Sequence, residues 1–150
     1  MTVLPIFLLL WVSLAASVQG YANYDITAPQ NGRRYYVSKD HEAFNLATMN
    51  GRCRGLNGYL VQIDTRQEFD LVWSIADEVS GVGPFFTGIT DEGSEGHFYT
   101  YNDKKPAGFL SWRWFQPDNW YGENCVEIWM TGLNDIACGK SGRYICEVPV

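Results

Sequence analysis

Residues 116–138 read Gln-Pro-Asp-Asn-Trp-Tyr-Gly-Glu-Asn-Cys-Val-Glu-Ile-Trp-Met-Thr-Gly-Leu-Asn-Asp-Ile-Ala-Cys. The stretch is rich in side chains that offer oxygen: Gln116, Asp118, Asn119, Glu123, Asn124, Asn134 and Asp135. Calcium takes about six to eight such oxygens from carboxylates, amides, backbone and water. Because one group precedes Cys125 and the other precedes Cys138, a bridge between these cysteines would unite them. Composition alone favours a different interpretation, a solvated polar loop.

The chain has four cysteines: Cys53, Cys125, Cys138 and Cys146. An even count in an exported chain predicts two disulfides, with three possible pairings. Zinc is the competing interpretation. It is disfavoured because no cysteines have the C-x-x-C spacing and only His41 and His97 could complete a site.

The first twenty residues have the pattern of a signal peptide. The apolar run Leu4–Ala16 is too short to cross a bilayer core of about 30 Å, and small residues follow it up to Gly20. We predict cleavage after residue 20, secretion to the extracellular space and no membrane insertion of the mature chain; a membrane anchor is the alternative. The remaining residues suffice for one domain, with a short arm at 21–32 and the domain at 33–150.

The charge balance bears on possible partners. The chain carries 17 acidic and 11 basic residues, a net charge of −6. This balance disfavours a polyanionic partner such as nucleic acid. No heptad or collagen-like segment indicates an oligomeric state.

The pattern of apolar residues predicts an α+β fold. We expect an edge strand at 33–37, a helix at 39–54 that buries Cys53, and a strand at 59–63. A capping box, Thr65 to Glu68, starts a second helix that runs to about residue 78. Short strands are expected at 85–89, 98–101, 126–129 and 144–148. The segment between Asp91 and Asp135 is irregular and aromatic-rich, which is typical of a functional loop.

Ordered landmarks between Arg33 and Glu147 resemble the C-type lectin domain family. They comprise the cysteine spacing, Phe86-Thr87-Gly88-Ile89, Thr90-Asp91-Glu92, Glu95-Gly96-His97-Phe98, Gln116-Pro117-Asp118, Gly122-Glu123-Asn124-Cys125 and Leu133-Asn134-Asp135. The resemblance implies a C-type lectin-like fold with two helices packed on small antiparallel sheets and a long calcium-binding loop. It also implies the disulfides Cys53–Cys146 and Cys125–Cys138.

The resemblance also implies where calcium binds. A principal ion would be held by Gln116, Asp118, Glu123, Asn134 and Asp135, with Pro117 in the cis form. An auxiliary ion would lie among Asp91, Glu95, Asn119 and Asn124. The two asparagines stand where the family has carboxylates, so we expect the auxiliary site to be weaker than in the family.

By the same resemblance, the sugar site comprises the five principal ligands together with Trp120. The order Gln-Pro-Asp implies galactose or N-acetylgalactosamine, and Trp120 would stack on the sugar's apolar face. Only Tyr121 and Gly122 separate Trp120 from Glu123, a shorter connection than galactose binders often have. We expect glycans on glycoproteins or on microbial or self surfaces as partners. The alternative is a protein ligand bound without sugar.

No motif indicates an enzyme. Gly139-Lys140-Ser141 resembles the end of a phosphate loop but lacks the earlier glycine, since Asn134 stands there. The chain also has no Gly-x-Ser-x-Gly motif. We therefore predict a binding protein without catalysis.

Overall fold

The computed structural model describes residues 21–39, 41, 45–80 and 84–150. The predicted signal peptide lies outside the described residues, as do residues 40 and 42–44 of the first predicted helix. Among the described residues, no helix combines the length and apolar character needed to cross a membrane.

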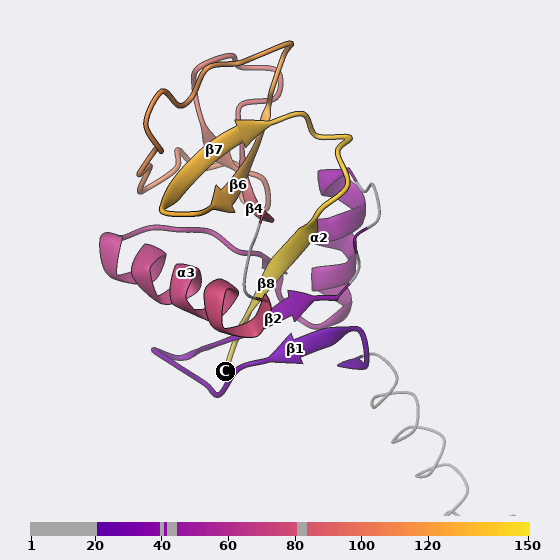
Figure 1. Cartoon of the computed structure of the whole chain (residues 1–150). Helices are drawn as coiled ribbons and strands as arrows, with labels where there is room; N and C mark the ends of the chain where they lie inside the picture. Colours follow the sequence, from indigo (N-terminus) through magenta and orange to yellow (C-terminus); the bar gives the residue numbers. More distant parts are fainter. Residues whose placement is uncertain (1–20, 40, 42–44, 81–83) are drawn as a thin grey trace, which may run out of the picture.

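The sheet path runs β1-β2-β8-β4-β6-β7, with β3 paired to β8 and β5 paired to β4. One antiparallel group, β1, β2, β3 and β8, is joined to another, β4 to β7, by the parallel pairing of β4 with β8. The two helices are packed at the lower left and right in Figure 1, and the long loops extend above β6 and β7. The elements are β1 (Tyr24–Ile26), β2 (Arg33–Ser38), α2 (Leu46–Gly55), β3 (Tyr59–Leu60), α3 (Arg66–Ser80), β4 (Phe85–Thr90), β5 (Tyr99–Thr100), β6 (Cys125–Trp129), β7 (Gly132–Ile136) and β8 (Arg143–Pro149).

The prediction that residues 33–37 form an edge strand is wrong. Strand β2 lies between β1 and β8, because Tyr24–Ile26 in the predicted arm forms a strand of its own. This interior position buries Tyr35, Tyr36 and Val37. The arm therefore contributes to the sheet.

The helices begin at polar caps. Helix α2 starts later than the predicted residue 39: the Asn45 side chain accepts the Thr48 backbone N–H at 2.8 Å and caps the helix. At α3, Thr65 Oγ1 accepts the Glu68 N–H at 3.1 Å, as a capping box requires. The reciprocal hydrogen bond of the capping box differs from the prediction: Glu68 Oε2 accepts the backbone N–H of Asp64, one residue before Thr65.

Both predicted disulfides are present. Cys53–Cys146 joins α2 to β8, and Cys125–Cys138 joins the start of β6 to the segment that follows β7. Cys125 lies opposite Ile136 in the β6–β7 register. The short bridge thus closes the base of the hairpin that carries Asn134 and Asp135.

Candidate functional site

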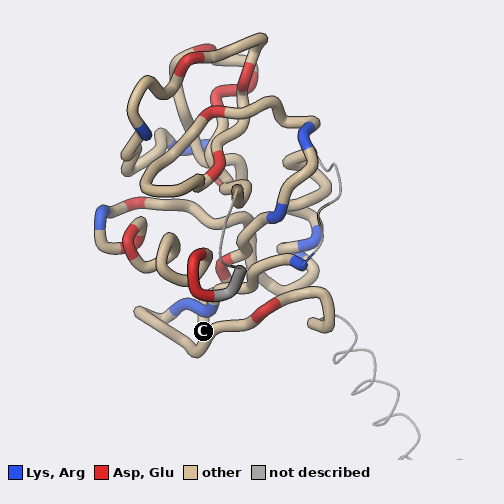
Figure 2. Tube along the Cα trace, viewed as in Figure 1, with Lys and Arg blue, Asp and Glu red and all other residues tan. Residues whose placement is uncertain are grey.

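Three carboxylates converge at the end of the domain that carries the long loop. Asp118 comes from the loop, Glu123 precedes β6, and Asp135 lies on β7. One oxygen of each lies within 4.8 Å of the others. Figure 2 shows several acidic positions gathered in these loops, at the top of the view. Oxygens that share one calcium ion at about 2.3–2.6 Å lie at most about 5 Å apart, so the spacing suits a calcium ion.

Strand β7 supplies two of the predicted residues, although the sequence pattern did not identify it as a strand. Asn134 faces Glu127 across the β6–β7 ladder, and its Nδ2 donates to Glu127 Oε1 at 2.9 Å. This contact fixes the amide and leaves the Asn134 carbonyl oxygen available to a cation. Burial raises the pKa of Glu127 to about 7 against the opposing effect of the Asn134 hydrogen bond. No pattern in the sequence marked Glu127 as a site residue.

Asp135 organises the loop that precedes β6. Its Oδ1 accepts the N–H of Asp118 at 3.1 Å, and its Oδ2 accepts the N–H of Asn119 at 2.7 Å. The Gln116–Pro117 peptide bond is cis, as predicted. The buried β7 carboxylate therefore sets the backbone of the Gln-Pro-Asp segment.

The amide of Gln116 completes the cluster. Gln116 Nε2 donates to Asp118 Oδ2 at 3.2 Å, whereas Gln116 Oε1 is shielded from water and has no hydrogen-bond partner. A buried acceptor without a donor is costly. A cation beside the carboxylates would satisfy this oxygen, so the residues present fit calcium.

Without a cation, the carboxylates disfavour one another's charge. Burial, together with the nearby charges of Asp135 and Asp118, raises the pKa of Glu123. The attraction of the three carboxylates to a divalent cation would outweigh their mutual repulsion.

Of the predicted auxiliary ligands, Asp91 is buried at the start of the loop after β4; its N–H donates to Asn124 O at 3.2 Å, and its Oδ1 has no hydrogen-bond partner. Glu95 is exposed in the next turn. The backbone N–H of Asn119 donates to Asp135. The auxiliary site stays a prediction.

Trp120 lies beside the cluster and is 67% exposed. Its N–H donates to Asp118 Oδ1 at 3.1 Å, and its ring lies 5.2 Å from the Tyr121 ring, centroid to centroid. Two further exposed aromatic side chains, Trp114 and Phe115, precede Gln116. The aromatic enrichment of this segment was visible in the sequence, but which rings face solvent was not.

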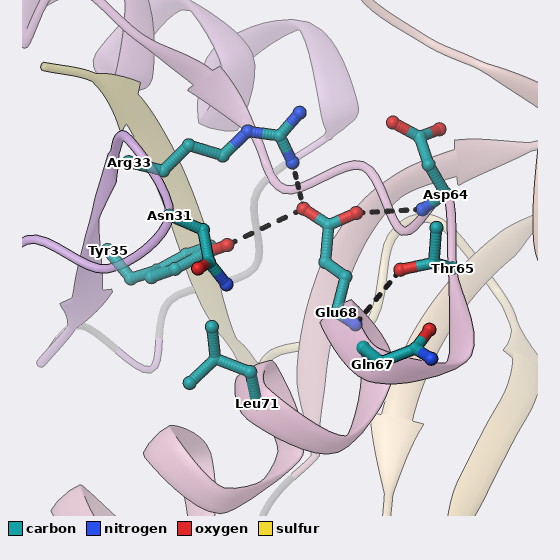
Figure 3. Close-up of a pocket in the computed structure, with 8 residues that line it drawn as sticks. All are labelled: Asn31, Arg33, Tyr35, Asp64, Thr65, Gln67, Glu68 and Leu71. Carbon is teal, nitrogen blue, oxygen red and sulfur yellow. Dashed lines mark hydrogen bonds and ion pairs between the residues drawn. The ribbon is translucent and has the colours of Figure 1, made fainter.

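A second polar cluster lies between the turn before β2 and the start of α3. It borders a cavity of about 290 Å³ (Figure 3). Arg33 forms an ion pair with Glu68, and its Nε lies 3.8 Å from Glu147 Oε1. Burial raises the pKa of Glu147 to about 7. This effect outweighs the Gln62 N–H hydrogen bond and the Arg33 charge, which both lower the pKa. This cluster ties β2, β8 and α3 together.

Comparison with known proteins identifies related chains. The family model "Lectin C-type domain" matches residues 42–148. C-type lectin 37Db of Drosophila melanogaster is 26% identical over 97% of this chain and 96% of its own length. A C-type lectin galactose-binding isoform of Hoplocephalus stephensii is 30% identical over 79% of this chain and 78% of its own. Two mouse relatives are longer, and the chain spans 22% and 38% of them.

The fold also matches that of solved C-type lectin structures. The carbohydrate-recognition domain of the human scavenger receptor C-type lectin superimposes with a TM-score of 0.72 at 26% identity. The match covers 86% of this chain and 98% of that domain.

Proposed function

This chain belongs to the C-type lectin domain family, and we propose that it is a secreted lectin whose carbohydrate site depends on calcium. The observation that carries the proposal is the convergence of Asp118, Glu123 and Asp135 beside the buried, unpartnered Oε1 of Gln116. This donor set suits a hard cation and includes no soft ligand. Family members generally bind carbohydrate without catalysing a reaction, so we propose a binding role for the whole chain.

The calcium would be held by the mixed set of amides and carboxylates: Gln116, Asp118, Glu123, Asn134 and Asp135. When bound, the ion supplies coordination positions for two neighbouring sugar hydroxyls. The carboxylates would accept hydrogen bonds from the two sugar hydroxyls. The Gln116 amide has a second N–H that can donate to a hydroxyl oxygen, whereas both N–H groups of Asn134 already donate, to Glu127 Oε1 and Asp135 O. A second, weaker ion is proposed at Asp91, Glu95, Asn119 and Asn124.

We propose galactose or N-acetylgalactosamine as the preferred sugar. The amide at 116 and the carboxylate at 118 set the order of donor and acceptor along the site. Trp120 offers an exposed ring that can stack on the apolar face of galactose. The Tyr121 ring packs on Trp120, which supports the indole despite the short connection to Glu123. The Hoplocephalus stephensii relative is named as a galactose-binding isoform, which agrees with this choice.

Secretion is part of the proposal. Residues 1–20 are proposed to be a cleaved signal peptide, and residues 33–150 the lectin domain. The two disulfides suit an oxidising compartment outside the cytosol. The proposed partners are galactose-type glycans on glycoproteins or on microbial or self surfaces.

Retention on immobilised galactose tests the function. The mature protein should bind in calcium and elute with a chelator, and Glu123→Gln should pass through. Asp77→Asn on α3 is the matched control; it removes one exposed carboxylate away from the acid cluster and should bind like the wild type. Failure to bind any sugar on a glycan array in calcium would overturn the proposal. Chelator-resistant binding to a protein would support the protein-ligand alternative.

A further inference from the structure

Two aromatic corners flank the Gln-Pro-Asp segment. The N–H of Gln116 donates to Arg113 O at 3.0 Å, which closes a turn with Trp114 and Phe115 at its corner. The N–H of Gly122 donates to Asn119 O at 3.1 Å, which closes a second turn with Trp120 and Tyr121 at its corner. Each corner therefore presents two neighbouring rings, one pair on each side of Pro117 and Asp118.

Both corners hold an aromatic residue in an unfavourable backbone conformation. Phe115 has φ +66° and Tyr121 has φ +57°. Each is the third residue of its turn, where a positive φ usually selects glycine. The side chains do not offset this cost by burial, since Phe115 is 83% exposed and Tyr121 is 91% exposed. Folding stability does not account for these rings, and backbone strain of this kind is associated with functional sites.

The Trp114–Phe115 corner is separate from the ring assigned to galactose. Trp114 is 87% exposed, and its ring stacks on Phe115 with centroids 5.7 Å apart and planes 23° apart. Phe115 directly precedes Gln116, and consecutive Cα atoms lie about 3.8 Å apart. The corner therefore adjoins the cation cluster through Gln116.

We propose that the Trp114–Phe115 corner is a second stacking subsite, which contacts the next sugar residue of an oligosaccharide whose terminal galactose occupies the cation site. The inference rests on the proposed lectin function and extends it from a monosaccharide to a chain. Sugar rings combine an apolar C–H face with polar edges. This surface matches two aromatic corners separated by the exposed, polar Asp118.

Two other occupants fit less well. A membrane surface would bring the amide of Gln116 and the carboxylate of Asp118 into a medium that penalises polar and charged groups. A second copy of the chain would need about 1,000 Å² of buried area, whereas each large aromatic side chain buries only about 150–250 Å². A glycan residue is the partner whose size and polarity match the corner.

Calorimetry with galactose, lactose and a galactose-terminated trisaccharide tests the proposal in calcium. Wild type should bind the longer sugars roughly two- to tenfold more tightly than galactose, the range expected for one stacking contact. Trp114→Ala and Phe115→Gly should remove this gain and keep the galactose affinity within about twofold of wild type. Glycine suits the positive φ at 115, so that variant should fold. Trp114→Phe should retain the gain, and Ile26→Ala on β1 serves as an exposed control.

The outcomes separate this inference from the proposed function. Failure of wild type to bind any of the three sugars overturns the galactose assignment and this subsite, whereas failure to bind any sugar on a glycan array overturns the lectin function itself. Wild-type binding that is equal for galactose and the trisaccharide overturns the second subsite alone, as does an equal loss of both ligands in the variants. Binding of wild type to phosphatidylcholine vesicles that is lost in Trp114→Ala would identify a membrane surface instead. A dimer in sedimentation that dissociates in Trp114→Ala would identify a self-association surface instead.

Discussion

The carboxylate of Asp135 accepts the backbone N–H of Asn119 at 2.7 Å, so a buried strand residue fixes the conformation of an exposed loop residue sixteen positions earlier. The same carboxylate belongs to the acid cluster. Asp135 thus shapes the loop and contributes charge to the proposed calcium site, and a substitution there removes both contributions.

Substitutions at Asp135 and Glu123 should separate these contributions. We expect Asp135→Asn and Glu123→Gln each to lower calcium affinity at least about tenfold, because each removes a charged ligand. Only Asp135→Asn should speed amide exchange at Asp118 or Asn119 in chelator, because the amide keeps one accepting oxygen and its NH₂ cannot accept the other hydrogen bond. Calorimetry and hydrogen exchange measure the two effects. Unchanged exchange at both Asp118 and Asn119 in Asp135→Asn would show that the loop does not depend on this carboxylate.

Glu123→Gln should change stability in opposite directions with and without calcium. In chelator it removes repulsion among three carboxylates, so the midpoint of thermal unfolding should rise. In calcium it weakens binding and should lower the midpoint, since a ligand at 100 times its Kd stabilises by about 2.7 kcal/mol. Differential scanning calorimetry under both conditions measures the crossover. A lower midpoint in chelator would contradict the repulsion inferred from the raised pKa of Glu123.

Glu147 should make folding stability fall with rising pH. Burial raises its folded-state pKa from 4.5 to about 7. Between these values the folded state binds more protons than the unfolded state, so this contribution to stability declines through the window and then levels off. Glu147→Gln should remove the decline and stabilise the protein at pH 8 by on the order of 2–3 kcal/mol relative to pH 5. Urea unfolding at the two pH values measures the difference, and equal effects at both would refute the assignment.

The order of amide and carboxylate at 116 and 118 should determine sugar preference. Wild type should be inhibited by galactose more strongly than by mannose. The double variant Gln116→Glu with Asp118→Asn should keep calcium, lose galactose and gain mannose, because donor and acceptor exchange places. Trp120→Ala should weaken galactose binding and leave calcium affinity unchanged. Competition binding measures the sugar preferences and calorimetry the calcium affinities, and equal inhibition of wild type by both sugars would end the selectivity hypothesis.

The two disulfides should differ in what they protect. Cys53–Cys146 closes a loop of sequence separation 93, and Cys125–Cys138 one of 13. Chain entropy predicts about 4–5 kcal/mol for the long loop and about 3 kcal/mol for the short one. Replacing the long pair by serines should lower global stability, whereas replacing the short pair should mainly reduce calcium affinity. Chemical denaturation and calorimetry distinguish these effects, and an equal loss of calcium affinity in both would contradict the prediction.

Apolar periodicity predicted the helices and most strands because it reports directly on local structure, whereas both bridges were implied by the resemblance to the C-type lectin domain family. Strand β7 was missed because Asn134 and Asp135 have low strand propensity, and their pairing with β6 supplies what propensity lacks. The interior position of β2 also required knowledge of a tertiary partner, the three-residue strand β1.

The oxygen-rich residues of the site were visible in the sequence, but their supports were not. Glu127 is one residue in a short β-prone run, and only the β6–β7 register places it against Asn134. The conformation of the two aromatic corners could not be predicted from the sequence for a related reason. A positive φ at Phe115 or Tyr121 runs against residue preference, so the sequence gives no indication of it.

The loop from Trp114 to Tyr121 is attached to the domain through few points, chiefly the turn at Arg113 and the hydrogen bonds to Asp135. Its exposed side chains contribute little to the hydrophobic core beneath. We therefore expect residues 114, 115, 120 and 121 to tolerate randomisation in a display library while the scaffold folds. Under the proposed calcium dependence, such a library would yield engineered glycan reagents that release their ligand when calcium is removed.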